Sequence, residues 1–563
     1  MAAHPPDGTH GSRETQQQQE NFTAKLIHFR HAHPIFRRPK FFQGRKIRGT
    51  EAKDLLWFNA DGSEMTDEHW NKSFIRCIGV GSQRDSVRFR RAFRFGSRMR
   101  KTKIICTLGP ATESADVLHA MIAAGANIFR LNMSHATHDW VRMIVPRIRA
   151  IAKEMDVIVG ILMDTQGPAI RTGDLPTKLE LKVGDVFEFT VRGGKSEELY
   201  SVDVNYDGLI DDISAGDVVL VDNGNIHMKV LAKEGIKIRC EVLTSGVMGS
   251  RRHINLPGVK VNLPPLTEKD LADVAVGAEL HVDYVALSFC REPNDVDVLR
   301  KVLREHDSTA RIIAKIEDQL AVKNINAIIQ TADVIMVARG DLGIECPMEE
   351  LPIIQRRIVK RCLAKGVPVI VATHMLESMI TNPVPTRAEI TDVANAVFEQ
   401  ADAIMLSGET TVGKYPVKCV EVMHKVAVRI ERSGGAGFAE EAHLDDDRQK
   451  TVRSAVSLAN SLPNAKIVVF TRRGTMADYV SNLRPNAPIY AFSPTFEVCR
   501  KLVVNWGTFP HYLAFDPNPN RTISAAMDIL VGEGLAKTGE HLVIVSDMLA
   551  GEERFDTIQL RVV

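Results

Sequence analysis

The sequence contains few cysteines, few aromatic residues and almost no net charge. Its 563 residues include eight cysteines, 6% aromatic residues and a formal net charge of +1. The cysteines are scattered singly, without a C-x-x-C pair, which argues against a disulfide framework and against a zinc site. Isolated thiols of this kind are typical of a reducing compartment, so we expect a cytoplasmic protein.

Long apolar runs are missing as well. No segment approaches the roughly 20 apolar residues that a membrane span requires, and the polar residues 1–20 lack the apolar core of a signal peptide. Residues 1–98 carry 18 Lys and Arg against 10 Asp and Glu, whereas the remainder carries 53 against 60. A mildly acidic body with a basic leader does not suggest a nucleic-acid-binding protein. We therefore expect neither a membrane nor a nucleic acid as a partner.

The chain does contain a repeated strand-and-helix pattern. A short apolar run recurs eight times, and most of the runs are separated by helical patterns such as Ala115–Ala124. The runs are Lys103–Thr107, Asn127–Ser134, Val159–Thr165, Val282–Ser288, Arg311–Glu317, Asp333–Asp341, Val367–His374 and Ala403–Glu409. Eight such repeats predict a (β/α)8 TIM barrel, an α/β fold with its chemistry at the carboxyl ends of the strands.

Two other regions depart from this rhythm. Residues 174–259 show period-two patterns such as Val186–Val191, with turn signals such as Asn223-Gly224, and predict a small inserted β-barrel domain that closes over the mouth. In residues 435–563, three strand patterns (465–471, 487–493 and 541–547) alternate with helical ones and predict an open α/β domain with a regulatory or interface role. The catalytic barrel then comprises residues 99–173 and 260–434.

Three charged residues stand out at the ends of two neighbouring runs. Lys315 and Glu317 end the fifth run, and Asp341 ends the sixth. A lysine and two carboxylates that converge there suit a divalent cation that neutralises phosphate oxygens, with the ammonium facing developing negative charge. Each run alone is explained equally well by a core strand with solvated charges at its end. The interpretation as a cation site therefore depends on the two runs lying side by side.

Nine motifs, in order along the chain, resemble those of the pyruvate kinase family. They are Thr102–Pro110, Arg130–His135, Asp164–Gly173, Ile254–Gly258, Ala314–Glu317, Met336–Glu345, Ala372–Met379, Pro385–Glu389 and Met405–Thr410. The resemblance covers about residues 99–563. It implies transfer of the phosphoryl group of phosphoenolpyruvate to ADP, which gives pyruvate and ATP in glycolysis, and it implies a homotetramer.

The resemblance also assigns roles at the phosphoenolpyruvate site. Lys315, Arg130 and Thr373 would be catalytic: Lys315 faces the charge on the transferring phosphoryl group, and Arg130 meets the phosphate. The backbone N–H groups of Gly340 and Asp341 would receive the substrate carboxylate, with Thr373 beside it. Phosphoryl transfer asks mainly for such positioning and charge neutralisation.

Ion and nucleotide sites follow from the same resemblance. Glu317 and Asp341 would hold Mg²⁺ or Mn²⁺. The residues implied for K⁺ are Asn132, Ser134, Asp164 and Thr165, and those implied for the nucleotide are Asn132, His135, Arg171 and Arg252. Potassium-dependent members usually carry Glu where this chain has Ala169. Because all four K⁺ ligands are present, we expect K⁺ binding to be retained.

The C-terminal region differs from family members that fructose 1,6-bisphosphate activates. Thr471–Met476 keeps part of the phosphate-binding turn, but Leu549–Arg554 places two carboxylates where a phosphate would lie. A phosphate beside carboxylates is repelled. We therefore expect no activation by this bisphosphate.

Residues 22–80 lie outside that resemblance and resemble a C-terminal fragment of a glycogen-debranching, isoamylase-like enzyme. The segment lacks a pair of acids placed for glycoside hydrolysis. We expect residues 1–98 to comprise a disordered leader, this glycosidase-like remnant and a basic linker. Two other functions stay open for the chain: another phosphoenolpyruvate-using barrel enzyme, such as an aldolase, and a catalytically silent regulatory paralogue.

Overall fold

The computed structural model describes residues 99–194, 196–198, 200–550 and 553–563, without the side chains of 547–550 and 553–555. All of these residues belong to one compact unit, residues 91–563. The predicted leader, glycosidase-like remnant and linker within residues 1–98 therefore lie outside the described residues. The isoamylase-like resemblance of residues 22–80 stays a prediction.

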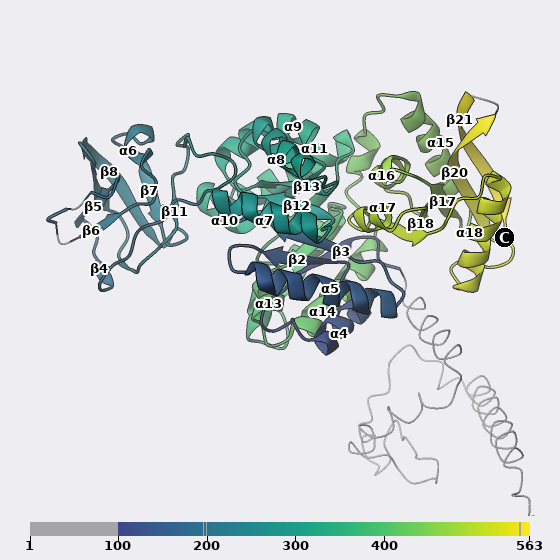
Figure 1. Ribbon diagram of the computed structural model, residues 1–563, viewed down its shortest axis with the longest axis horizontal. Coiled ribbons are helices and arrows are strands. Elements are labelled where there is room, and N and C mark those ends of the chain that lie inside the picture. Colours follow the sequence, from purple (N-terminus) through teal and green to yellow (C-terminus); the bar gives the residue numbers. More distant parts are fainter. Residues whose placement is uncertain (1–98, 195, 199, 551–552) are drawn as a thin grey trace, which may run out of the picture. The chain divides into compact units, whose positions relative to one another are not determined.

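Eight parallel strands close into a barrel in the order β1-β16-β15-β14-β13-β12-β3-β2 (Figure 1). Their bounds are β1 Lys103–Thr107, β2 Ile128–Asn132, β3 Gly160–Asp164, β12 Tyr284–Leu287, β13 Arg311–Ile316, β14 Val334–Ala338, β15 Val369–Ala372 and β16 Ala403–Leu406. The strands are buried on both faces, because side chains fill the barrel and helices cover it. The predicted (β/α)8 barrel is confirmed.

The main covering helices begin where the sequence offers caps or an early proline. They are α4 Ala115–Ala124, α5 His138–Glu154, α7 Glu268–Glu279, α8 Pro293–Glu305, α9 Gln319–Thr331, α11 Leu351–Lys365, α12 Arg387–Phe398 and α14 Pro416–Glu431. The Thr267 and Thr386 side chains each accept a first-turn N–H in a capping box, and Pro416 supplies a first residue whose missing N–H costs nothing there.

Most of the predicted runs are trimmed in the structure, and one of them changes into a helix within the site region. The run Asp333–Asp341 ends as a strand at Ala338, and a seven-residue helix, α10 (Arg339–Glu345), begins at once. Its first residue is buried, with the Arg339 guanidinium donating to the Thr373 carbonyl at 2.6 Å and to the Asp392 carboxylate at 2.6 Å. These contacts hold Arg339 at the start of the helix, so Gly340 and Asp341 lie in its first turn.

The insertion is all-β, as predicted. Its elements are β4 Leu179–Leu181, β5 Val186–Thr190, β6 Ser201–Asp203, α6 Leu209–Asp212, β7 Val218–Val221, β8 Ile226–Glu234, β9 Lys237–Val242, β10 Gly246–Met248 and β11 Ile254–Asn255. They form a six-stranded sheet, β11-β7-β8-β9-β5-β6, and a separate β10-β4 ribbon around one apolar core. The hydrogen bonding is that of an open sheet with a ribbon, not of one closed ring.

The C-terminal region is an open α/β sheet in the order β19-β18-β17-β20-β21. Its elements are α15 Asp447–Ser461, β17 Lys466–Phe470, α16 Thr475–Asn482, β18 Ile489–Ser493, α17 Phe496–Lys501, β19 Thr508–Tyr512, α18 Pro519–Gly532, β20 His541–Ala550 and β21 Glu553–Val562. The sequence pattern predicts three of the five strands. It misses both edge strands, of which β19 carries Pro510, a residue tolerated in sheets mainly at an edge.

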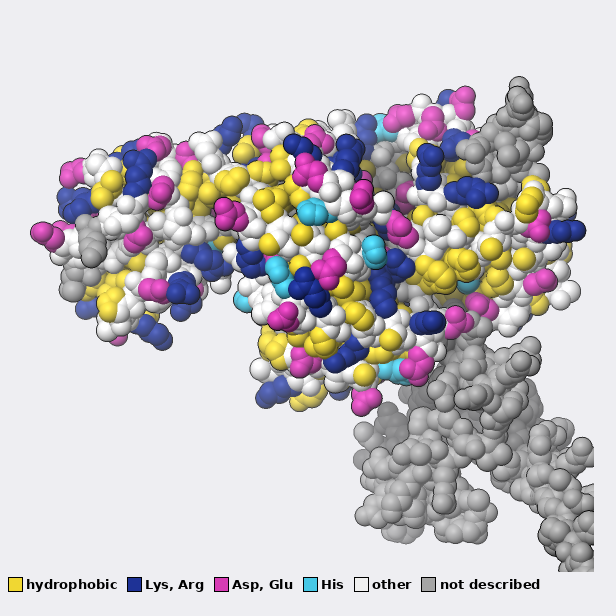
Figure 2. Space-filling view, in the orientation of Figure 1, with side chains coloured by type: hydrophobic (Ala, Val, Ile, Leu, Met, Phe, Trp, Pro, Cys, Tyr) yellow, Lys and Arg dark blue, Asp and Glu magenta, His cyan; other side chains and the backbone are white. Residues whose placement is uncertain are grey.

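The surface mixes charges of both signs. On the face shown in Figure 2, Lys and Arg side chains are interspersed with Asp and Glu side chains. Among the described residues, no helix combines the length and the apolar character that crossing a bilayer takes.

Candidate active site

Strand periodicity places four polar side chains on the inner side of the barrel mouth. The residues Ile128, Leu162, Ala286 and Ile313 belong to the cluster that fills the barrel interior. Side chains alternate along a strand, so the residues two positions further on share that inner side. These are Arg130, Asp164, Ser288 and Lys315. Arg130, Asp164 and Lys315 belong to β2, β3 and β13, Ser288 directly follows β12, and all four meet at the carboxyl end.

Lys315 lies at the centre of this group. Its Nζ lies 2.8 Å from Glu317 Oε1 and 3.3 Å from Asp164 Oδ1, and it donates to Ser288 Oγ at 2.7 Å. Burial disfavours the charged form, but the two carboxylates outweigh it and raise the pKa of Lys315 above its ordinary value. The ammonium is therefore permanently charged at neutral pH and held in one position.

Asp164 links this lysine to the neighbouring arginine. Its Oδ2 accepts from Arg130 Nε at 2.6 Å, and Arg130 Nη1 also donates to Thr107 Oγ1 at 3.0 Å. Burial would raise the pKa of Asp164, but Lys315 and Arg130 outweigh it and hold that pKa below its ordinary value. Asp164 thus fixes the positions of both Arg130 and Lys315 beside the cavity.

Glu317 and Asp341 face the same cavity from β13 and α10. Glu317 Oε2 accepts the Phe289 N–H at 2.6 Å. Burial raises the pKa of Glu317 above its ordinary value; Lys315 opposes the shift and the charge of Asp341 adds to it. A cation between the two carboxylates would relieve this repulsion. Among the described residues, no cluster of three or more His, Cys, Asp or Glu side chains forms an all-protein metal site.

The cavity has a volume of about 360 Å³ and is bounded by the barrel mouth and the insertion. Nine predicted site residues line it: Arg130, Asn132, Ser134, Thr165, Arg171, Arg252, Lys315, Glu317 and Asp341. On the insertion side, Arg252 Nη1 pairs with Asp222 at 3.1 Å, while its buried Nε has no hydrogen-bond partner among the described residues.

Four predicted residues lie off the cavity wall. Asp164 is buried beneath it, and His135 is exposed outside it. Gly340 and Thr373 are joined behind Asp341, where the Gly340 N–H donates to Thr373 Oγ1 at 2.6 Å. Thr373 has a φ of 68°, a left-handed conformation that costs a β-branched residue energy and is held here by the Arg339 contact.

The sequence analysis missed three residues of this site. Ser288 receives the Lys315 hydrogen bond, the Phe289 backbone binds Glu317, and His253 lines the cavity with its ring 5.9 Å from that of Phe289. Burial lowers the pKa of His253 below its ordinary value. A signal existed for Ser288, the polar residue that ends the fourth predicted strand. None existed for Phe289, which acts through its backbone.

The chemistry of this mouth suits a phosphotransferase, because phosphoryl transfer depends mainly on positioned cations that neutralise phosphate charge. Residues 99–420 match the family model "Pyruvate kinase, barrel domain", and residues 449–561 match "Pyruvate kinase, alpha/beta domain". The chain belongs to the pyruvate kinase family.

Curated relatives from plants and bacteria carry the same family name. The chain is 41% identical over 451 residues to "Pyruvate kinase isozyme G, chloroplastic" of Nicotiana tabacum, a match that covers 79% of this chain and 80% of the relative. It is 42% identical over 468 residues to "Pyruvate kinase" of Geobacillus stearothermophilus, covering 80% and 78%. For "Pyruvate kinase" of Clostridium acetobutylicum the identity is 39% over 455 residues, covering 80% and 96%.

Proposed function

We propose that this cavity transfers the phosphoryl group of phosphoenolpyruvate to ADP, and that the residues predicted from the sequence carry the reaction. The observation that supports this best is Lys315, whose buried ammonium is held by Asp164, Glu317 and Ser288 in the cavity that Arg130 also lines. An ammonium with a fixed position stabilises charge that develops in the transition state without reorganising.

Substrate binding is assigned to the residues around this ammonium. Arg130 and Lys315 neutralise the phosphoryl oxygens, and Lys315 also faces the enolate oxygen that forms when the phosphoryl group leaves. The Gly340 and Asp341 N–H groups lie at the N-terminus of α10, where backbone donors suit an anion. With Thr373, they are assigned to the substrate carboxylate, for which the Gly340 N–H would exchange its bond to Thr373 Oγ1. This arrangement aligns the substrate for transfer, which is most of what such a reaction needs.

The donor atoms fit the predicted ions. Glu317 and Asp341 supply two carboxylates and leave other positions for water and phosphate oxygens, which is how Mg²⁺ is usually bound. When bound, Mg²⁺ or Mn²⁺ neutralises phosphate oxygens. Asn132, Ser134, Asp164 and Thr165 offer only oxygen ligands for K⁺, and Asn132 pairs with Asp164 across β2 and β3. Arg171 and Arg252, with Asn132 and His135, are assigned to ADP.

A coupled assay tests this function. The full chain is supplied with phosphoenolpyruvate, ADP, Mg²⁺ and K⁺, and pyruvate release is followed through lactate dehydrogenase. We expect ADP-dependent pyruvate formation that EDTA abolishes and added Mg²⁺ restores, and a lower rate when tetramethylammonium replaces K⁺. Phosphoenolpyruvate consumption without ATP would favour another barrel enzyme. No consumption at all would favour the silent paralogue.

The remaining expectations belong to the same proposal. They are a homotetramer, a cytoplasmic location, domain bounds of 99–173 with 260–434, 174–259 and 435–563, and insensitivity to fructose 1,6-bisphosphate. Light scattering of the purified chain tests the oligomer. The tobacco relative is named chloroplastic, so location is tested by imaging a tagged full chain. The carboxylates expected to repel the bisphosphate lie where the structure describes no side chains.

A further inference from the structure

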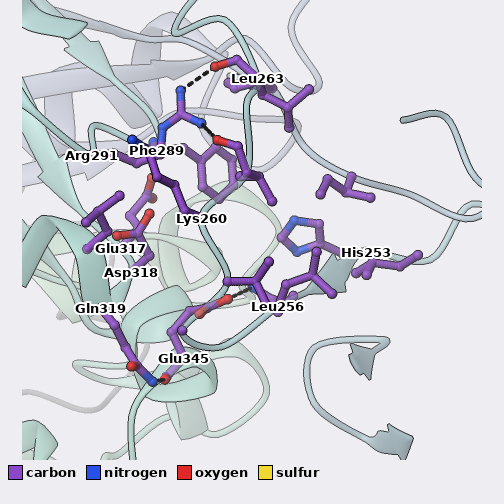
Figure 3. Close-up of a pocket in the computed structure, with 18 of the residues that line it drawn as sticks. His253, Leu256, Lys260, Leu263, Phe289, Arg291, Glu317, Asp318, Gln319 and Glu345 are labelled. Carbon is purple, nitrogen blue, oxygen red and sulfur yellow. Dashed lines mark hydrogen bonds between the residues drawn. The ribbon is translucent and has the colours of Figure 1, made fainter. Parts of the chain in front are cut away.

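A second cavity, of about 250 Å³, adjoins the active-site cavity and shares His253, Phe289 and Glu317 with it. Figure 3 shows its walls: residues of the returning connection from the insertion on one side, and Glu317, Gln319 and Glu345 of the barrel on the other. The insertion and the barrel therefore meet here, directly behind the carboxylates assigned to the metal. Glu345 is the last residue of α10, the helix that begins with the substrate-binding Gly340 and Asp341.

The N-terminal end of α10 is fixed to the barrel. Arg339 donates to the Ala372 and Thr373 carbonyls of the neighbouring strand end at 3.2 and 2.6 Å, and the Gly340 N–H bonds Thr373 Oγ1. These contacts all come from β15 and the residue after it. They hold the start of the helix, and none of them involves a residue of the insertion.

The C-terminal end of α10 is fixed differently. Glu345 Oε1 accepts from Asn255 Nδ2 at 3.0 Å, and Asn255 belongs to β11, which pairs with β7 of the inserted sheet. The Glu345 carbonyl accepts from Gln319 Nε2 at 2.5 Å. Asn255 is 5% and Glu345 9% exposed, so a side-chain hydrogen bond between insertion and barrel is shielded from water at this point.

We propose that Asn255 and Glu345 are positioning residues. Through their hydrogen bond, the position of the insertion sets the position of α10 and, with it, that of Gly340 and Asp341. The inference rests on the proposed function of those two residues. A helix of seven residues moves as a unit when one end is displaced, because its backbone bonds overlap along nearly its whole length. A shift at Glu345 is therefore felt at the substrate carboxylate and at the metal ligand.

The pair is built to respond to small displacements. The Asn255 side chain contributes one hydrogen bond, and its other amide atom, Oδ1, has no partner among the described residues. The adjoining Leu256 N–H, from the same connection, also interacts with Glu345. Burial also raises the pKa of Glu345 to about 7, although its hydrogen bond with Asn255 opposes the shift. Loss of that bond would leave a buried carboxylate poorly solvated, and such a group is strongly disfavoured. The position of the insertion is thus coupled to the Asn255–Glu345 hydrogen bond.

The test exchanges the donor and the acceptor. Asn255→Asp sets a carboxylate against Glu345, and adding Glu345→Gln restores one donor and one acceptor in the reverse sense. Burial already raises the pKa of Glu345 to about 7, and a facing carboxyl raises it further, so the measurement is made at about pH 9. There we expect N255D to raise the half-saturating phosphoenolpyruvate concentration about tenfold, with kcat changed less than about threefold. The double variant should return to within about threefold of wild type.

A second readout is independent of turnover. Amide hydrogen exchange of the peptide containing residues 339–345 should accelerate in N255D and recover in the double variant. The matched control is Asn395→Asp, which makes the same change against Glu399, the buried partner of Asn395 at 3.1 Å in the barrel. It should alter neither half-saturation nor exchange of α10.

The outcomes separate the two proposals. A lower thermal midpoint in N255D with unchanged half-saturation and unchanged α10 exchange would mean that the pair is only structural, and would overturn the inference. Additive losses in the double variant would overturn it as well. An inactive wild-type chain that shows the expected exchange pattern would support the coupling while sinking the proposed function.

Discussion

The two ends of the same eight strands use buried charge in opposite ways. At the carboxyl ends, Arg130 and Lys315 border a cavity, and both pair with Asp164 beneath it. At the amino ends, Asp283 and Asp402 are also fully buried, but their partners are arginines and backbone N–H groups. The charged side chains at the carboxyl ends lie beside a ligand cavity, whereas those at the amino ends are paired within the protein.

The amino-end aspartates follow a common pattern. Asp402, just before β16, accepts from Arg484 Nη2 at 2.6 Å and from the N–H groups of Val369 and Trp506 at 2.9 and 3.0 Å. Asp283, just before β12, and Asp333, just before β14, likewise accept an N–H from the start of a neighbouring strand, those of Ile161 and Ile312, and pair with arginines. Several of the partners belong to the C-terminal region. These ion pairs connect barrel strands to other strands and to the C-terminal region, whereas the charged residues at the mouth lie at the cavity assigned to the substrate.

The largest expected effect is at the mouth. Lys315→Met removes the ammonium assigned to the transferring group, and we expect kcat to fall about 10²–10³-fold, the loss typical of a group aimed at transition-state charge. The coupled assay measures it, with circular dichroism to establish that the variant is folded. Turnover near that of wild type would refute the role of Lys315.

At the opposite end, Arg484→Ala should affect stability instead of chemistry. It leaves the Asp402 carboxylate without its cation, and breaking a buried ion pair in this way typically costs about 3–5 kcal/mol. The midpoint of urea unfolding should fall accordingly, while kcat per folded molecule stays within about twofold of wild type. A variant with unchanged unfolding but reduced kcat would reverse the contrast between the two ends.

The smallest effect is a pH dependence at the amino end. Lys103 donates to the Thr508 carbonyl at 2.5 Å, and its burial, together with Arg100, lowers its pKa to about 7 although Glu431 and Asp402 oppose the shift. Between about pH 7 and its ordinary value of 10.5, the unfolded chain binds a proton that the folded chain has released. Stability from this group therefore rises with pH across that window and is lowest below it.

Thermal unfolding measured from about pH 6.5 to 9.5 checks this dependence. The difference in midpoint between the wild type and Lys103→Met should change across the window, because the variant lacks the group that titrates. Parallel curves for the two proteins would show that Lys103 keeps its proton in the folded state.

Much of the barrel was predictable because strand periodicity is local. All eight runs became strands, with each end shifted by at most three residues, and Asp333–Asp341 is among those with the largest shift. That run was overextended, because a strand pattern in the sequence does not reveal that Arg339 bonds β15 and starts a helix. The missed strands β19 and β21 lie at sheet edges, where one side lacks a strand neighbour and the apolar signal is weaker.

The amino-acid sequence by itself determined the number of barrel strands, the predominance of strands in the insertion and the place of Lys315 and Glu317 at the end of a strand. Those features depend on neighbours only a few residues away. Only the tertiary structure decided that Lys315 would bond Ser288, that Phe289 would hold Glu317, and that Asn255 would reach Glu345. These partners are 27 to 90 residues apart, and it is the folding of the barrel with its inserted sheet that brings them within hydrogen-bonding distance.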